Sequence, residues 1–251
     1  MRLKLFLRVL CLQAGWSFER MQGLGFAYCV DPWLKQCYAG RAGERRAAQL
    51  RHQEYFNTQP YMASLVLGMV CALEEEAAAI EGAQRTEKLD RLRALKTAAA
   101  AALAGLGDAL FWGTLRPVCA ALALASAWIC SGSPEEAVVL AAAVYLVSFN
   151  VPVLYMRWRF LGQGYRWKEQ IAVNLKDWSG QGRIRALRLG GMALALAAAV
   201  VLLRDTVPWQ RPVGILAMAA AVGLRALRVS SYRLYAATIL IGVLASWTGW
   251  L

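Results

Sequence analysis

Residues 54–76 read EYFNTQPYMASLVLGMVCALEEE, and this stretch decides the fold class. It begins with hydrogen-bonding side chains at Asn57, Thr58 and Gln59. The apolar segment that follows, residues 61–73, is too short to cross a bilayer as a helix, and three consecutive glutamates end it. Irregular backbone at membrane depth persists only where it is buried in protein or lines a watery cavity, so the stretch predicts a short helix with an enclosed polar tip. The alternative interpretation is an ordinary helix cap at the membrane interface, with solvated glutamates at the other end.

The composition indicates an integral membrane protein. Of the 251 residues, 59% are hydrophobic and 18% are charged, and the mean hydropathy is +0.39. Soluble domains are typically about 45–50% apolar and about 25% charged. The excess is not a signal peptide, because Lys4 and Arg8 interrupt the N-terminal apolar stretch and no clear cleavage site follows. We therefore predict an all-α membrane protein with several transmembrane helices, re-entrant helical hairpins and an amphipathic N-terminal helix.

The net charge of +12 does not indicate a nucleic-acid partner, because the basic residues cluster between apolar blocks as the positive-inside rule predicts. The six cysteines form no CxxC motif and no metal-ligand spacing, so we predict reduced packing residues, no metal and no cofactor. The sequence has no phosphate-binding glycine loop and no nucleophile elbow. We expect no catalytic residue in this chain.

The apolar blocks divide the chain into three regions. Residues 1–40 form an amphipathic arm and interface segment, residues 41–180 a transport core with broken or re-entrant helices, and residues 181–251 the C-terminal transmembrane helices. The segments at 137–156 and 234–251 are close to spanning length. Segments 189–203 and 213–224 could span with help from their flanks.

The charges between these spans predict the orientation. Eight Lys or Arg residues lie between residues 157 and 188, against only Glu169 and Asp177. This loop should therefore face the cytoplasm, which leaves the C-terminus outside. The eight residues are Arg157, Arg159, Arg166, Lys168, Lys176, Arg183, Arg185 and Arg188.

A second polar interruption occurs at residues 103–117, LAGLGDALFWGTLRP, and makes residues 98–112 another short apolar segment. An ionisable residue such as Asp108 is costly inside an apolar segment and is by default a candidate for function. Trp112 beside amides and carboxylates suits a sugar, because the ring covers the apolar face while polar groups take the hydroxyls. Trp112 alone could equally be a membrane-interface anchor. Two such segments in one chain favour a carbohydrate pathway.

Three motifs closely resemble the IID membrane subunit of the mannose/fructose/sorbose-type bacterial phosphotransferase system (PTS). They are GWSFERMQGLGF (15–26), RHQEYFNTQPYMASLVLGMVCALEEE (51–76) and LAGLGDALFWGTLRP (103–117). PVLYMRWRFLGQGY (152–165) is a weaker match to the same family. The resemblance covers roughly residues 5 to 180, and the C-terminal helices agree in character only.

The resemblance implies a function and a set of partners. IID subunits pair with a IIC membrane subunit in the bacterial inner membrane, in trimers of such heterodimers, and carry a hexose inward. A cytoplasmic IIB protein, phosphorylated on histidine and supplied by IIA, then transfers phosphate to the sugar. The IID subunit carries no phosphohistidine, and His52, the sole histidine here, has no catalytic partner beside it in the sequence.

The polar segments and the resemblance together assign the candidate site. Glu19 and Arg20 are an ion pair at the IIC interface or, alternatively, part of a polar helix face. Only one or two of the three glutamates can face a pocket, because neighbouring helical residues point about 100° apart. The predicted hexose-binding residues are Asn57, Thr58, Gln59, Glu74, Glu75, Asp108 and Trp112.

Two departures from the family support an alternative function. Typical members carry proline at the positions of Ala102 and Ala109, where it fixes backbone angles at a predicted helix break. This chain is also shorter toward the C-terminus than typical members. The alternative is a degenerate IID-like scaffold or regulatory partner of IIC that no longer transports sugar.

Overall fold

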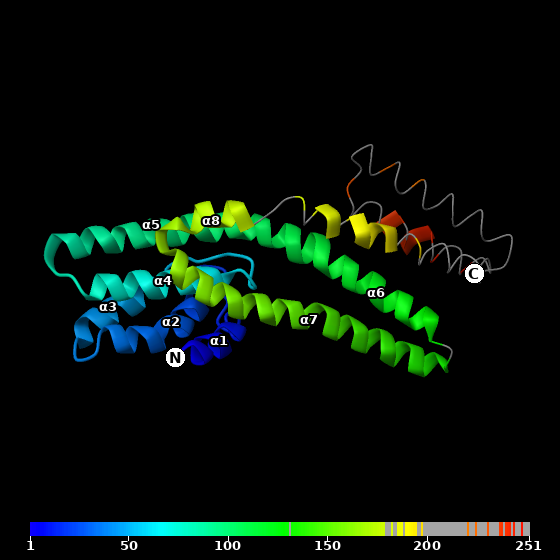
Figure 1. Cartoon of the computed structure of the whole chain (residues 1–251), viewed down its shortest axis with the longest axis horizontal. Coiled ribbons are helices and arrows are strands. Elements are labelled where there is room, and N and C mark those ends of the chain that lie inside the picture. Colours follow the sequence, from blue (N-terminus) through cyan, green and yellow to red (C-terminus); the bar gives the residue numbers. More distant parts are fainter. Residues whose placement is uncertain are drawn as a thin grey trace. The chain divides into compact units, whose positions relative to one another are not determined.

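The computed structural model describes residues 1–130 and 132–178, together with separate positions between 182 and 247. The chain divides into two compact units, Met1–Leu194 and Ala195–Leu251, and the first contains the regular elements (Figure 1). The described residues contain helices and two isolated β-bridges but no strand, which confirms the all-α prediction. Most of each predicted span at 189–203, 213–224 and 234–251 falls outside the described residues.

Eight α-helices, one π-helical segment and one short 3-10 helix follow one another along the described part of the first unit. The N-terminal helix is amphipathic as predicted, because Leu5 and Val9 are buried while Arg2 and Lys4 are exposed. The helices are α1 (Arg2–Leu10), α2 (Gly23–Cys37), α3 (Ala42–His52), α4 (Ala63–Ala78), α5 (Gly82–Gly107), the π-helix (Asp108–Leu115), α6 (Arg116–Ile129), α7 (Pro134–Trp167), the 3-10 helix (Lys168–Gln170) and α8 (Ile171–Trp178).

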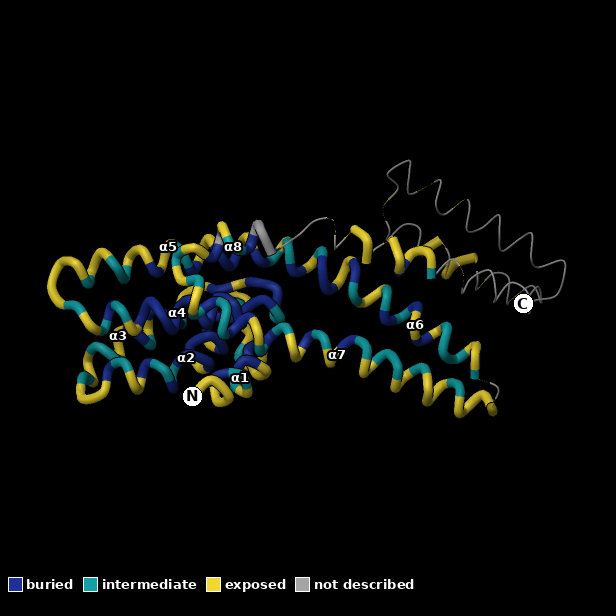
Figure 2. The backbone as a smooth tube through the Cα atoms, in the orientation of Figure 1, coloured by how far each residue is buried: buried dark blue, intermediate teal, exposed yellow. Residues whose placement is uncertain are grey.

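Helix α4 is the centre of the core and packs against α2, α5 and α7 (Figures 1 and 2). Residues 63–74 are buried without interruption. Glycines let the α4 and α7 backbones touch: a Cβ on Gly68 would lie 2.2 Å from the Leu161 carbonyl oxygen, and one on Gly164 would lie 1.9 Å from the Leu65 carbonyl oxygen. Small residues at such crossings are typical of helices that pack within membranes.

The segment at 98–112 differs from the sequence expectation. It is not a separate short segment, because helix continues from Gly82 to Ile129 through α5, the π-helix and α6. Alanine at 102 and 109 keeps the backbone N–H that proline would remove, so the helix is not interrupted there. The irregularity remains as a widened turn, the π-helix Asp108–Leu115, rather than as a break.

Helix α7 is longer than the predicted span at 137–156. It begins at a capping box, in which the Ser133 side chain and backbone exchange hydrogen bonds with Glu136, and it ends at Trp167. Its last part, residues 157–167, lies inside the predicted cytoplasmic loop. Helix continues there because Phe160, Leu161 and Gly164 recur at helical spacing and are buried. Helices Gly82–Ile129 and Pro134–Gln170 are long and apolar enough to cross a membrane.

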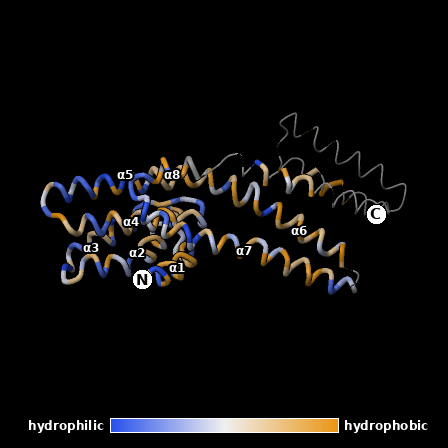
Figure 3. Tube along the Cα trace, viewed as in Figure 1, coloured by the Kyte–Doolittle hydropathy of each residue, from blue (hydrophilic) through white to orange (hydrophobic). Residues whose placement is uncertain are grey.

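The outer halves of α6 and α7 expose apolar side chains instead of burying them (Figures 2 and 3). On α7 the exposed apolar residues include Val138, Val139, Leu146 and Val147. Such a surface is costly in water and favourable in hydrocarbon. The folded core formed by α1–α4 therefore continues into an apolar arm formed by the helices α6 and α7.

Candidate functional site

The polar tip before α4 is a loop fastened to its neighbours by hydrogen bonds. Thr58 is buried, and its hydroxyl donates to the Ala100 carbonyl oxygen of α5 at 2.9 Å. Its backbone exchanges two hydrogen bonds with the Gln22 side chain, at 2.8 and 3.2 Å. Asn57, by contrast, is exposed, and within the described part of the chain its side chain makes no hydrogen bond. The loop is therefore held in place while the Asn57 amide is left available.

Gln59 caps the turn that leads into α4. Its Oε1 accepts from the backbone N–H groups of Tyr61 and Met62, at 2.7 and 3.1 Å. Two backbone donors on one oxygen fix the orientation of the amide, so the NH₂ group points the other way. Gln59 is only 2% exposed, so this Nε2 is buried, and it has no hydrogen-bond partner among the described residues. A buried donor without a partner is rare and needs an explanation.

The π-helix lies directly against this tip. A Cβ on Gly107 would come within 2.5 Å of Gln59 Cβ, so glycine is what allows α5 to approach Gln59 this closely. The next residue, Asp108, is exposed at the start of the π-helix. The Thr114 hydroxyl donates to the Ala109 carbonyl oxygen, five residues earlier, at 2.8 Å. π-helical turns are frequent at functional sites.

An aromatic cluster extends from the tip to α7. The Tyr61 ring centroid lies 5.0 Å from that of Phe111 and 5.6 Å from that of Trp112. Trp112 also stacks on Phe149 of α7, with centroids 6.4 Å apart. The guanidinium of Arg157 covers the Tyr61 ring at 4.8 Å. Trp112 remains 39% exposed, so one part of its ring is packed and another is accessible.

Glu74 lies at the opposite end of α4, about 16 Å along the helix from its first turn at 1.5 Å per residue. Its carboxylate is buried and accepts from four groups of the chain itself. Tyr38 donates its hydroxyl at 2.6 Å, Arg51 donates from Nε and Nη2 at 2.8–3.1 Å, and His52 Nε2 lies 2.8 Å away. These contacts join α2, α3 and α4, so Glu74 holds three helices together.

The protonation of this cluster follows from its burial and its contacts. Burial lowers the pKa of His52 from 6.5 to about 4, in spite of the hydrogen bond to Glu74, so the imidazole is neutral. Burial alone would raise the pKa of Glu74, but the hydrogen bond from His52 and the charge of Arg51 outweigh it and lower the pKa to about 2. Neutral His52 donates from Nε2, and its buried Nδ1 has no partner within the described residues. The cluster is thus an ion pair of Arg51 and Glu74 supported by two neutral donors.

This protonation predicts how stability depends on pH. Below pH 6.5 the unfolded chain protonates His52 while the folded chain does not, so stability falls as pH falls. Glu74 adds a further loss below about pH 4.5, because its folded pKa is lower than its ordinary value. We expect His52 alone to cost about 2 kcal/mol between pH 7 and pH 5, measured as thermal unfolding in detergent. His52→Gln, which keeps a donor and does not titrate, should lose much less, and an equal loss in both proteins would contradict the assignment.

The other two glutamates lie on the surface of the same helix end. The Glu75 carboxylate accepts from the Tyr165 hydroxyl of α7 at 2.6 Å. Glu76 forms ion pairs with Lys88 of α5 and with Lys168, at the end of α7. These contacts connect α4 with α5 and α7 and lie away from the polar tip.

Glu19 and Arg20 lie in the turn between α1 and α2, so they are not part of a polar helix face. Both side chains are exposed, and within the described residues they form no ion pair with each other. The Arg20 backbone oxygen accepts from Gly23 N and Phe56 N, which ties this turn to the start of the polar tip.

The structure separates the predicted residues along the chain's fold. Gln59 packs against Gly107, the residue before Asp108, and Tyr61 lies beside Trp112, whereas Glu74 and Glu75 lie at the other end of α4. Sequence reasoning missed Tyr61, because a tyrosine at the start of an apolar segment carries no specific signal. It also missed the partner of His52, because Glu74 is 22 residues away in the chain.

Most of the chain matches a known protein family. The family model of the PTS system mannose/fructose/sorbose family IID component matches residues 1–207. The mannose-specific EIID component of Escherichia coli (strain K12) is 37% identical over 191 residues, which are 76% of this chain and 62% of that protein. The sorbose-specific EIID component of Klebsiella pneumoniae is 35% identical over 192 residues, 76% of this chain and 64% of that protein. The chain thus spans about three fifths of the length of these relatives.

Two solved structures share the fold. A cryo-EM structure described as the mannose transporter ManYZ in complex with microcin E492 contains a chain that is 29% identical, with a TM-score of 0.59 and coverage of 99% of this chain and 96% of that one. A structure described as a membrane protein is 26% identical, with a TM-score of 0.67 and the same coverage.

Together with the two helices long enough to span a bilayer, these relatives identify a membrane protein. The family match covers most of the chain, including the polar tip and the π-helix. The protein belongs to the IID components of the mannose/fructose/sorbose family of the bacterial phosphotransferase system.

Proposed function

We propose that this chain is the IID subunit of a sugar-transporting phosphotransferase complex. With a IIC subunit it forms the path for a mannose-type hexose, which IIB, supplied by IIA, phosphorylates during uptake. Family membership supports this function, and so do relatives named as mannose-specific and sorbose-specific components. The chain crosses the bacterial inner membrane several times, with the basic segment after α7 in the cytoplasm and the C-terminus outside.

One observation carries the assignment of the sugar site: the buried Gln59 Nε2 has no partner among the described residues, and the Gln59 side chain packs against Gly107, the residue before the π-helix. A sugar hydroxyl that accepts from this amide would satisfy it. Asn57, two residues before Gln59, and Asp108, which follows Gly107, are both exposed and offer further groups for hydroxyls, and Thr58 anchors the loop. The accessible part of Trp112 covers the apolar face of the ring.

We assign different roles to the acidic residues of the predicted site. Because the Glu74 carboxylate is fully engaged by Tyr38, Arg51 and His52, it acts in folding rather than in sugar contact. Glu75 supports the contact between α4 and α7 through Tyr165. Glu19 and Arg20, exposed in a turn attached to the polar tip, remain our candidates for the contact with IIC.

The experiment that separates transport from a scaffold role is phosphoenolpyruvate-dependent hexose phosphorylation. Membranes that contain IIC and this chain are mixed with IIA, IIB and the general phosphate carriers, and compared with membranes that lack only this chain. A transport subunit predicts sugar phosphate with the complete set alone. Equal phosphorylation without the chain, or none with the complete set on any mannose-type hexose, would contradict the proposal and favour the scaffold.

A further inference from the structure

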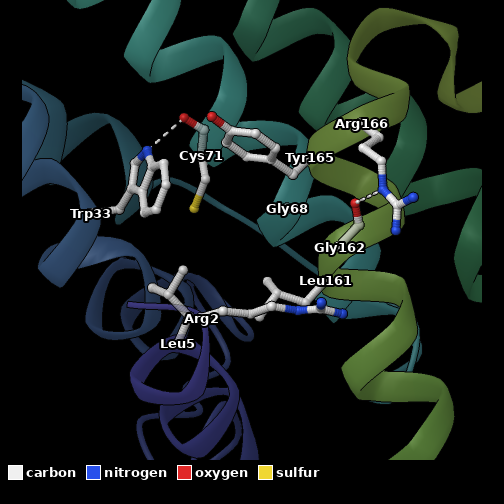
Figure 4. A pocket seen from close by; sticks show the side chains of 9 residues that line it. All are labelled: Arg2, Leu5, Trp33, Gly68, Cys71, Leu161, Gly162, Tyr165 and Arg166. Atoms are coloured by element: carbon white, nitrogen blue, oxygen red, sulfur yellow. Dashed lines mark hydrogen bonds between the residues drawn. The ribbon is translucent and has the colours of Figure 1, made fainter.

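A cavity of about 280 Å³ lies between α1, α2, α4 and α7, away from the polar tip (Figure 4). Its lining is largely apolar and includes Leu5, Gly68 and Leu161. Drug-sized ligand pockets usually measure about 300–1,000 Å³, so this volume suits part of one chain-like group better than a whole rigid molecule. The full lining is Arg2, Leu5, Trp33, Gly68, Cys71, Leu161, Gly162, Tyr165 and Arg166.

Two guanidinium groups lie at one side of this cavity, with Gly162 between them (Figure 4). Arg2 Nη2 donates to the Trp158 carbonyl oxygen at 2.5 Å, and the same guanidinium covers the Trp158 ring at 4.3 Å. Arg166 Nε donates to the Gly162 carbonyl oxygen at 3.3 Å. A Cβ on Gly162 would lie 2.7 Å from Arg2 Nη2, so glycine leaves the room in which Arg2 reaches α7.

Neither guanidinium has a carboxylate partner among the described residues. Seven other arginines do form ion pairs with carboxylates: Arg8, Arg41, Arg45, Arg51, Arg85, Arg91 and Arg93. Each guanidinium has five N–H groups and only one of them is used here, so both have donors to spare. The nearby Glu75 is hydrogen-bonded to Tyr165, whose hydroxyl points away from both guanidiniums.

The geometry points to a binding site for an anionic phospholipid. We propose that Arg2 and Arg166 hold the lipid phosphate while the upper part of one acyl chain enters the cavity between α1 and α4. The planar guanidinium fork matches phosphate oxygens. A free phosphate or a carboxylate side chain would leave the apolar cavity empty, and a zwitterionic lipid would bring a positive group toward two arginines. Anionic lipids are concentrated in the cytoplasmic leaflet, the side on which the basic segment after α7 is expected.

The test is native mass spectrometry of the full chain in detergent with three probes. They are phosphatidylglycerol, phosphatidylcholine with the same acyl chains, and inorganic phosphate. We expect bound phosphatidylglycerol, at least about tenfold weaker binding of phosphatidylcholine, and no retained phosphate. Arg2→Gln with Arg166→Gln should weaken phosphatidylglycerol binding about tenfold or more, because charge-assisted hydrogen bonds are lost.

Two further variants keep the test decisive. Arg166→Gln alone should lose most of the phosphatidylglycerol binding. Because it leaves the contact of Arg2 with Trp158 intact, it replaces the double variant if Arg2→Gln fails to fold. Arg159→Gln is the matched control, since Arg159 lies on the same helix and contacts Tyr155 outside the cavity. Equal binding of both lipids, an unchanged preference in the double variant, or an equal loss in Arg159→Gln would overturn the proposal. Retention of inorganic phosphate at the affinity of the lipid would show an anion site instead.

Discussion

Glu74→Ala should destabilise the folded chain by about 3–5 kcal/mol, because it leaves Arg51 buried without its counter-charge. It also removes the acceptor for Tyr38 and His52, so that three buried donors lose their partner together. The measurement is the thermal unfolding of the purified chain in detergent at pH 7, together with the yield of folded protein from membranes. We expect a large fall in both quantities.

Glu75→Ala is the matched control for this variant. It removes an adjacent glutamate from the same helix, but the Glu75 side chain is exposed and its partner, Tyr165, can turn to water. We expect a change of about 1 kcal/mol or less. If Glu74→Ala were as stable as Glu75→Ala and lost only hexose binding, the folding role of Glu74 would be wrong and a direct sugar contact would be the better assignment.

Asn57→Ala should lower hexose uptake by about tenfold or more while leaving membrane insertion and assembly with IIC intact. The Asn57 side chain is exposed and makes no hydrogen bond within the described residues, so its loss costs the fold little. In the proposed site a sugar hydroxyl loses its hydrogen bond to water and gains one to the Asn57 amide. Without that amide the hydroxyl has no partner, so the sugar binds more weakly. Uptake of labelled hexose by intact cells and co-purification with IIC measure the two quantities.

Asn174→Ala provides the comparison for this experiment. Asn174 lies on α8, and its amide donates to the Gln170 carbonyl oxygen of the preceding turn, far in sequence from the polar tip. Uptake should stay near the wild-type level in this variant. Wild-type uptake in Asn57→Ala would remove Asn57 from the site, whereas loss of IIC from both variants would show that the defect is one of assembly.

Much of the fold could be predicted because membrane segments obey a simple rule of length and polarity. The apolar blocks gave the all-α class, and the basic and apolar mixture at 1–20 gave an amphipathic helix. The extent of α7 could not be predicted, because Arg157 and Arg159 look like the start of a loop. In the folded chain Arg157 is buried against Tyr61 and the α1 backbone, which only tertiary contacts can arrange.

The continuity of the helix through residues 102–109 could not be predicted either, because it also depends on tertiary contacts. Gly105, Gly107 and Asp108 disfavour helix locally, yet the backbone stays helical where Gly107 packs against Gln59 and Met62. Gln59 touches Gly107, so the two polar segments meet at this point. Glu74 is far from the two polar segments because α4 is an unbroken helix and Glu74 lies near its other end. The sequence alone did not indicate the direction of the Glu74 carboxylate.

The central claim is that the tip at 57–59 and the π-helix form one hexose site, and equilibrium binding of labelled hexose to the purified complex with IIC tests it most directly. Asn57→Ala and Trp112→Ala should each weaken binding by about tenfold or more, because one loses a hydroxyl partner and the other the surface under the sugar ring. The double variant should bind no better than either single one. Wild-type affinity in both single variants would contradict the claim, whatever their effect on uptake.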